Sequence, residues 1–158
     1  MRNTKSALIW VVEILNKRQI PFQVTGGFAA KIYGSKRKLA DIDIDIPENR
    51  FNELLNDVHS YIKFGPSQYK DSDWDLKLLT LNYKNQDIDL CGAYKVKIYN
   101  KLSKKWVILK SNFKKSIVKT MYGISIPVIP KNELISYKNK VLRGVDKIDI
   151  RYLKRKDV

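Results

Sequence analysis

The sequence predicts a single α+β domain with a mixed β-sheet core, flanking helices and a helical C-terminal end. Apolar residues recur at helical spacing near both ends of the chain and at strand spacing between them. The 158 residues, 44% of them hydrophobic, are enough for one domain with a real core, and no repeat or low-complexity linker divides them. We therefore expect one domain over residues 1–158, with its core at about 7–93 and a basic extension at about 94–158.

The N-terminal part is predicted to run helix, strand, turn, helix. Apolar positions follow helical spacing until Pro21, and a short apolar stretch then leads into two glycines and a second helical stretch that ends at Gly34. The expected elements are a helix at 7–17, a strand at 22–25, a turn at Gly26-Gly27 and a helix at 28–33.

Residues 41–46 alternate strictly between aspartate and isoleucine. This is the period of a strand with one face in the core, so the three isoleucines are expected to point inward and the three aspartates outward. Pro47 stops the strand, and the apolar spacing that follows predicts a helix over 48–59.

The rest of the chain is predicted to form further strands and two helices. Residues 74–83 and 87–90 are expected to pair as a hairpin across the polar turn 84–86. Short strands are expected at 96–99, 106–109 and 124–129, separated by lysine-rich loops, and helices at 133–142 and 145–153.

Positive charge is concentrated in the C-terminal part. Residues 1–94 hold 13 Lys/Arg and 12 Asp/Glu, whereas residues 95–158 hold 18 and 4, so the two parts carry +1 and +14. Such a distribution favours a polyanion such as a triphosphate or RNA, although solvated surface lysines would give the same pattern.

The chain has no apolar stretch of the roughly 18 residues that a membrane helix needs, and its N-terminus does not resemble a signal peptide. Its one cysteine, Cys91, cannot form an internal disulfide. We therefore expect a soluble, cytoplasmic protein without a membrane partner.

The alternating acids are the strongest candidate for chemistry. Asp41, Asp43 and Asp45 would project from one strand face, where their mutual repulsion favours bound cations. Two Mg²⁺ ions bridged by such carboxylates are what phosphoryl and nucleotidyl transfer use. The alternative from the residues alone is a solvated acidic strand face.

Two further signals in the sequence accompany these acids. Gly26-Gly27, between a strand and a helix, would let a phosphate approach the backbone, although such a pair is often only a turn. Asp87 and Asp89 share a later strand face, and Asp89 is the better third carboxylate because Ile88 and Leu90 flank it. The choice between Asp87 and Asp89 stays open here.

Together these residues resemble the DNA polymerase β-like nucleotidyltransferase superfamily: Gly-Gly, then Asp-x-Asp, then an acid between apolar residues. Within it, the chain is most similar to the small lincosamide and aminoglycoside nucleotidyltransferases, whose Asp-Ile-Asp-Ile-Asp run and short length it shares. The segment 126–153 is similar to the closing strand and helices of those enzymes.

The resemblance implies a role for each matching residue. Gly26 and Gly27 would hold the triphosphate, Asp41 and Asp43 would bind Mg²⁺, and Asp89 would bind metal or take the proton from the acceptor. Two basic residues, one before Asp-x-Asp and one in the C-terminal helices, would contact phosphate: Arg37 and Lys138.

The implied activity is a Mg²⁺-dependent transfer of a nucleoside monophosphate from ATP or another NTP to a hydroxyl, with two ions and an antibiotic-like small molecule as favoured acceptor. The alternatives are transfer to tRNA or other RNA, protein AMPylation, and a non-catalytic basic module that binds RNA through the C-terminal segment.

Overall fold

The computed structural model describes residues 1–155 and has the predicted α+β architecture. Nine strands form one sheet in the order β7-β6-β4-β5-β2-β1-β9-β8, and β3 pairs with β4 outside that path. The strands are β1 (Gln23–Thr25), β2 (Asp41–Ile46), β3 (Ile62–Lys70), β4 (Trp74–Tyr83), β5 (Gln86–Gly92), β6 (Val96–Asn100), β7 (Lys105–Leu109), β8 (Ile117–Met121) and β9 (Ile124–Val128).

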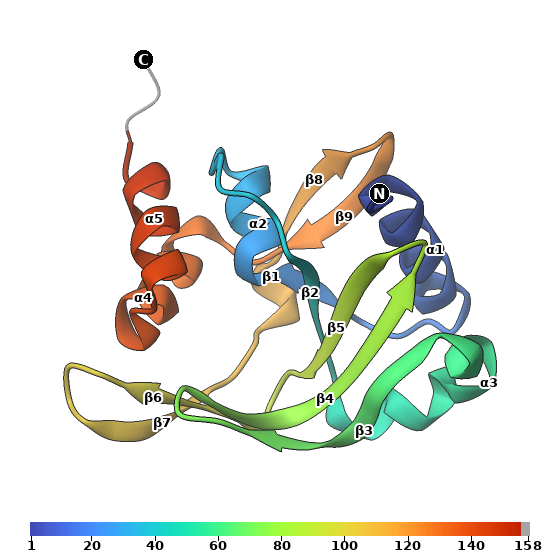
Figure 1. Cartoon of the computed structure of the whole chain (residues 1–158), viewed down its shortest axis with the longest axis horizontal. Coiled ribbons are helices and arrows are strands. Elements are labelled where there is room, and N and C mark those ends of the chain that lie inside the picture. The colour runs from blue at the N-terminus through green and yellow to red at the C-terminus, as the bar shows by residue number, and fades with distance from the viewer. Residues whose placement is uncertain (156–158) are drawn as a thin grey trace.

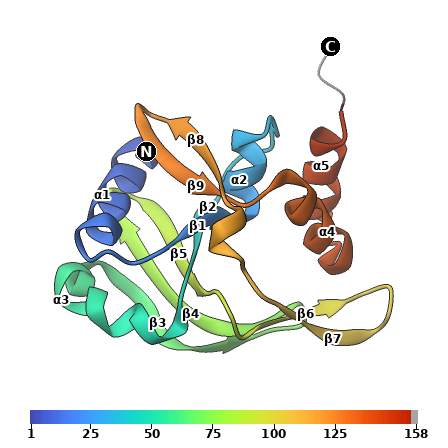
Figure 2. The ribbon, with the colours of Figure 1, turned by 180° about the vertical axis from the view of Figure 1, so that it is seen from behind.

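The helices lie in two groups at opposite ends of the molecule (Figures 1 and 2). Helices α1 (Thr4–Lys17) and α3 (Leu55–Val58) form one group, and α4 (Lys131–Val141) and α5 (Gly144–Leu153) form the other, while α2 (Gly26–Ile32) follows directly after β1. The described part of the chain also contains three 3₁₀ helices: η1 (Glu48–Leu54), η2 (His59–Tyr61) and η3 (Phe113–Lys115).

The sheet is mixed because β2 runs parallel to β5 and β1 runs parallel to β9, whereas the other pairs are antiparallel. The predicted hairpin of β4 and β5 is confirmed. Strand β9 comes from the basic C-terminal part but pairs with β1 beside the acidic strand β2. The C-terminal part therefore supplies the strands at this end of the sheet, with β9 next to β1 and β8 at the edge.

The core lies on the isoleucine face of β2. Ile42, Ile44 and Ile46 are fully buried, as the alternation predicted, and α1 covers this region with its own apolar stripe. Burying these side chains fixes the register of the strand, since a slip by one residue would place the aspartates in the core. The burial of isoleucine thus determines which way the carboxylates point.

The helix predicted over 48–59 is wrong for most of its length. The chain forms η1, a four-residue α3 and then η2 instead. Both carboxylate oxygens of Glu48 accept backbone N–H groups of residues 94 and 95, so the first turn is held by a distant loop rather than by its own capping. None of the helices within residues 1–155 combines the length and apolarity that crossing a membrane requires.

Candidate active site

The candidate site forms where β2 pairs with β5. The two strands are parallel, and Asp43 lies directly beside Asp89, with Asp41 beside Asp87. Residues that pair across adjacent strands point to the same side of the sheet. The two acidic motifs, which are far apart in sequence, therefore form one acidic surface opposite the isoleucine core.

Burial and mutual repulsion disfavour the charged forms of these carboxylates. Burial, and then the nearby Asp89, raise the pKa of Asp43 to about 7. Burial raises the pKa of Asp89 to about 6, against the effect of a hydrogen bond from Thr80. Burial, and then Asp87, also raise the pKa of Asp41. Among residues 1–155 none of Asp41, Asp43 and Asp89 forms an ion pair, so the charge of the cluster is not balanced by a neighbouring side chain.

The structure distinguishes Asp87 from Asp89. Burial opposes the ionisation of Asp87, but hydrogen bonds from Lys63 and Asn82 outweigh it and lower the pKa. The Lys63 Nζ lies 2.8 Å from Asp87 Oδ2. Asp89 receives only a neutral hydrogen bond, from Thr80 Oγ1 to Oδ1 at 2.7 Å. Asp87 is therefore already neutralised by a lysine, which leaves Asp89 as the better candidate.

The two glycines lie against the charged groups of the site. Gly26 adopts a φ of +63°, and a Cβ built on it would come within 2.2 Å of Asp43 Oδ2. A Cβ on Gly27 would come within 2.4 Å of Arg37 Nη2. Any side chain at either position would collide with a charged group, so the glycines keep the space between the carboxylate and the guanidinium open.

A cavity of about 580 Å³ contains these groups. Its lining includes both glycines, the acids of β2 and β5, and two arginines. Apolar side chains also line it: Leu39, Trp74, Leu76, Leu78, Val96 and Leu109. Within residues 1–155 no three His, Cys, Asp or Glu side chains already form a metal-binding group. The carboxylates still fit Mg²⁺, because it binds carboxylate oxygens and would stabilise the charges that burial disfavours.

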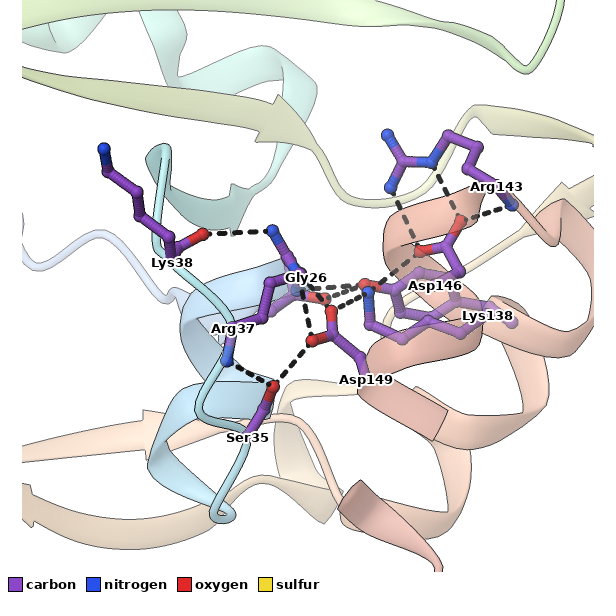
Figure 3. Close-up of polar contacts among 10 residues, drawn as sticks. Gly26, Ser35, Arg37, Lys38, Lys138, Arg143, Asp146 and Asp149 are labelled. Carbon is purple, nitrogen blue, oxygen red and sulfur yellow. Dashed lines mark hydrogen bonds and ion pairs between the residues drawn. The ribbon is translucent and has the colours of Figure 1, made fainter. Parts of the chain in front are cut away.

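A buried ionic network borders the cavity (Figure 3). The side chains of Lys138, Asp146 and Asp149 are 0% exposed, and the Lys138 Nζ lies 3.0 Å from Asp146 Oδ1 and 3.1 Å from Asp149 Oδ2. Each carboxylate also receives two hydrogen bonds from one arginine side chain, Arg143 for Asp146 and Arg37 for Asp149. The network thus joins the segment after α2 to α4 and α5.

The network changes the interpretation of the basic residues. Both arginines line the cavity, whereas Lys138 does not and is fully buried between two carboxylates. Lys138 was expected to contact phosphate, but the structure encloses it between Asp146 and Asp149, the carboxylates that hold the two arginines. Arg143 was missed by sequence reasoning, although the spacing of Arg143 and Asp146 at the start of α5 could have indicated a pair.

The raised pKa values predict how stability depends on pH. Between pH 4 and 7 the folded protein keeps protons on Asp43 and Asp89 that the unfolded chain has released. Because the folded state binds more protons, the free energy of unfolding falls as pH rises towards 7. We expect Mg²⁺ to raise the melting temperature more at pH 8 than at pH 5.5, measured by thermal unfolding with Mg²⁺ or EDTA. Asp43→Asn is the control and should reduce that difference. An equal Mg²⁺ effect at both pH values would contradict the prediction.

No protein-family model and no curated protein matches the chain, but solved structures do. An inferred nucleotidyltransferase from Thermotoga maritima superposes with a TM-score of 0.65 at 16% identity, over 86% of this chain and 85% of that one. The lincosamide antibiotic adenylyltransferase LnuA, with lincomycin bound, gives 0.63 at 14% identity over 98% of both chains. ANT(2'')-Ia in complex with adenylyl-2''-tobramycin gives 0.59 at 15% identity, over 94% of this chain and 86% of that one.

These matches extend over most of the chain and confirm the resemblance at the level of the fold. The protein has the fold of the DNA polymerase β-like nucleotidyltransferases, including that of antibiotic adenylyltransferases.

Proposed function

We propose that the protein is a Mg²⁺-dependent nucleotidyltransferase that moves a nucleoside monophosphate from an NTP to a hydroxyl of a small molecule. The observation that carries the proposal is the pairing of Asp43 with Asp89 across β2 and β5, beside Gly26 and Gly27, which begin α2 rather than forming the expected separate turn. The antibiotic adenylyltransferases that share the fold support the same reaction class.

The donor triphosphate would lie against Gly26 and Gly27, with its negative charge facing Arg37 and Arg143. Arg37 is held by Asp149 and Arg143 by Asp146, so neither guanidinium needs to be ordered when the nucleotide binds. Asp41 and Asp43 would hold Mg²⁺, which supplies charge neutralisation for the triphosphate and the leaving pyrophosphate.

In the reaction the acceptor oxygen attacks the α-phosphorus, the bond from that phosphorus to the bridging oxygen breaks, and pyrophosphate leaves. We assign the proton of the acceptor hydroxyl to Asp89. Thr80 donates a hydrogen bond to Asp89 Oδ1 and fixes the carboxyl group. The Asp89 pKa of about 6 suits a base that works near neutral pH.

A small-molecule acceptor fits the cavity best. Trp74, Leu76 and Leu78 of β4 line the cavity on the same face of the sheet as Asp89, since Thr80 pairs with Asp89 and Leu78 with Cys91. Pockets for small ligands are mostly apolar with a few placed polar groups. The fold is shared over 98% of both chains with a protein that has lincomycin bound. We therefore propose an antibiotic-like molecule with an apolar part and a free hydroxyl.

An RNA acceptor, or a basic module that only binds RNA, is the second candidate. Residues 95–132 contain ten lysines and no acidic residue, and the exposed Trp106 lies on β7 within this stretch. Basic surfaces with aromatic side chains bind single-stranded nucleic acid, in a strongly salt-dependent manner.

Isothermal titration with each NTP, with and without Mg²⁺, tests the proposal. We expect at least one NTP to bind only with Mg²⁺, and label from that NTP to pass to lincomycin or tobramycin rather than to total tRNA. Labelling of tRNA alone would favour the second candidate as an enzyme. Metal-independent, salt-sensitive RNA binding without NTP binding would favour the non-catalytic module and contradict the proposal.

A further inference from the structure

The backbone N–H group of Gly26 is already bound by a side chain. It donates a hydrogen bond to the hydroxyl oxygen of Tyr137, on α4, at 2.9 Å. The hydroxyl of Thr25 donates to the same oxygen at 3.3 Å. A phosphate that lies against Gly26 therefore meets the Tyr137 hydroxyl and not a free backbone N–H group.

The hydroxyl groups of Thr25 and Tyr137 have one hydrogen atom more than they use. Tyr137 Oη accepts both of these bonds, so its own hydrogen has no acceptor within residues 1–155. If the bond between the two hydroxyls runs the other way, the Tyr137 hydrogen is used, but that of Thr25 is left without an acceptor. One hydrogen-bond donor of the pair thus stays free in either arrangement.

The free hydrogen-bond donor faces the candidate site. Both side chains line the cavity, together with the two glycines and the acids of β2. Thr25 is 8% exposed and Tyr137 is 3% exposed, so bulk water reaches the pair poorly. A buried donor without a partner costs free energy until an acceptor binds. The Asp45 carboxylate does not fill this place, since its one hydrogen bond in the described chain comes from Ser111.

Packing holds the Tyr137 ring in place. The ring meets that of Trp74 edge to face, with their centroids 6.1 Å apart. The Arg143 guanidinium lies over the Trp74 ring, 5.7 Å from its centroid, and is itself bound by Asp146. These contacts join α4, β4 and the start of α5 at the cavity, so the hydroxyl needs little ordering when a ligand binds.

Helix α4 presents a tyrosine to the cavity where a lysine was expected. Lys138 is enclosed by Asp146 and Asp149, whereas Tyr137, one residue earlier, lines the cavity. Successive residues of an α-helix project about 100° apart, so the two side chains cannot share one direction. Helix α4 therefore contributes a neutral hydrogen-bond donor to the site, and not an ammonium group.

We propose that the Tyr137 hydroxyl donates a hydrogen bond to a phosphate oxygen of the bound NTP while it accepts one from Gly26, with Thr25 orienting it. The proposed position of the triphosphate, against Gly26, brings its oxygens to this hydroxyl, and an anionic oxygen is a strong hydrogen-bond acceptor. The inference rests on the proposed function, since it concerns the nucleotide of that reaction. It assigns nucleotide binding to a residue that the glycine and aspartate motifs do not include.

The test is isothermal titration of each NTP, with Mg²⁺ present, into the full chain and its variants. Tyr137→Phe keeps the ring and removes the hydrogen-bond donor, so we expect the Kd of the NTP that binds to rise at least about tenfold. The Gly26 N–H group that this change frees does not replace the hydroxyl, because a phosphate positioned on the hydroxyl lies one hydrogen bond further away.

Two matched variants serve as controls. Thr25→Val keeps the shape of its side chain and lets Tyr137 still accept from Gly26 and donate to phosphate, so the Kd should stay within about threefold of wild type. Tyr33→Phe removes a hydroxyl that bonds to the carbonyl oxygen of Ile129 and does not line the cavity, so it should leave the Kd unchanged.

A rise of less than about threefold in Tyr137→Phe would overturn the inference. Equal rises in Tyr137→Phe and Thr25→Val would overturn it too, because the pair would then act through its packing. If Tyr137→Phe does not fold, a crystal structure of the wild-type protein with Mg²⁺ and a non-hydrolysable analogue of the bound NTP decides. A distance above about 3.5 Å from Tyr137 Oη to every phosphate oxygen would contradict the proposal, and a shorter one would support it.

NTP binding and transfer separate this result from a failure of the proposed function. If an NTP binds but no acceptor is labelled, the proposed function fails, and the comparison of Kd values still decides the role of Tyr137. If no NTP binds with Mg²⁺, the proposed function also fails, and inorganic tripolyphosphate with Mg²⁺ is titrated instead. Tighter binding by wild type than by Tyr137→Phe would then support the hydroxyl as a phosphate ligand, and equal or absent binding would overturn it.

Discussion

Asp89→Asn is expected to keep Mg²⁺-dependent nucleotide binding and to lose about 10²- to 10⁴-fold of the transfer rate, the usual contribution of a general base. The asparagine preserves the size of the side chain and the hydrogen bond from Thr80, but it cannot take a proton. Asp43→Asn should instead lose both binding and transfer, because Asp43 lies against Gly26 at the start of α2, where the metal and the triphosphate would meet. The measurements are NTP titration and transfer of α-labelled phosphate to the acceptor that the wild-type protein labels.

Asp87→Asn is the matched control. It lies on the same strand and the same face, two residues from Asp89, but its carboxylate is paired with Lys63. We expect its transfer rate to stay within a few-fold of wild type. If Asp89→Asn loses nucleotide binding as Asp43→Asn does, then Asp89 is a metal ligand and our assignment of the proton is wrong. Equal losses in Asp87→Asn and Asp89→Asn would show that the two acids act only through overall charge.

The parts of the fold that the sequence predicted are those in which one face is buried. The bounds predicted for β2 and β4 agree with the structure, and so does the hairpin of β4 and β5, because apolar alternation reports directly on burial. β3 and β8 were missed for the opposite reason. β3 pairs only with β4 and β8 only with β9, and most of their side chains are not buried, so their residues show little alternation.

In the candidate site, too, the sequence predicted only what the alternation within one strand determines. The sequence placed Asp41 and Asp43 on one face, but it could not show that β5 runs parallel to β2 with Asp89 beside Asp43, since register depends on tertiary pairing. Nor could it show that Lys138 is enclosed by two acids of the next helix. A lysine in a basic segment is usually solvated, and only the packing of α5 on α4 buries this one.

Lys138→Met is expected to lower the free energy of unfolding by about 3 kcal/mol, as is typical when one member of a buried ionic group is removed. Methionine has a similar length, so the variant mainly removes the charge between Asp146 and Asp149. Each carboxylate keeps its arginine, but the two would repel each other inside the protein, and the arginines at the cavity wall would lose their fixed positions. Denaturant unfolding measures the loss of stability, and NTP titration should show weaker binding.

Dependence on pH separates the loss of charge from a loss of packing. Without Lys138 the pKa values of Asp146 and Asp149 should rise, because the ammonium helps to lower both against the effect of burial. The folded variant would then keep protons that the unfolded chain releases, so its deficit in stability should be smaller at pH 5 than at pH 7.5. Lys140→Met, on the same helix and only partly buried, is the control and should change stability by less than about 0.5 kcal/mol. If the stability deficit of Lys138→Met is the same at both pH values, then lost packing, and not the enclosed charge, accounts for the effect. The arginines would then not depend on Lys138 for their positions.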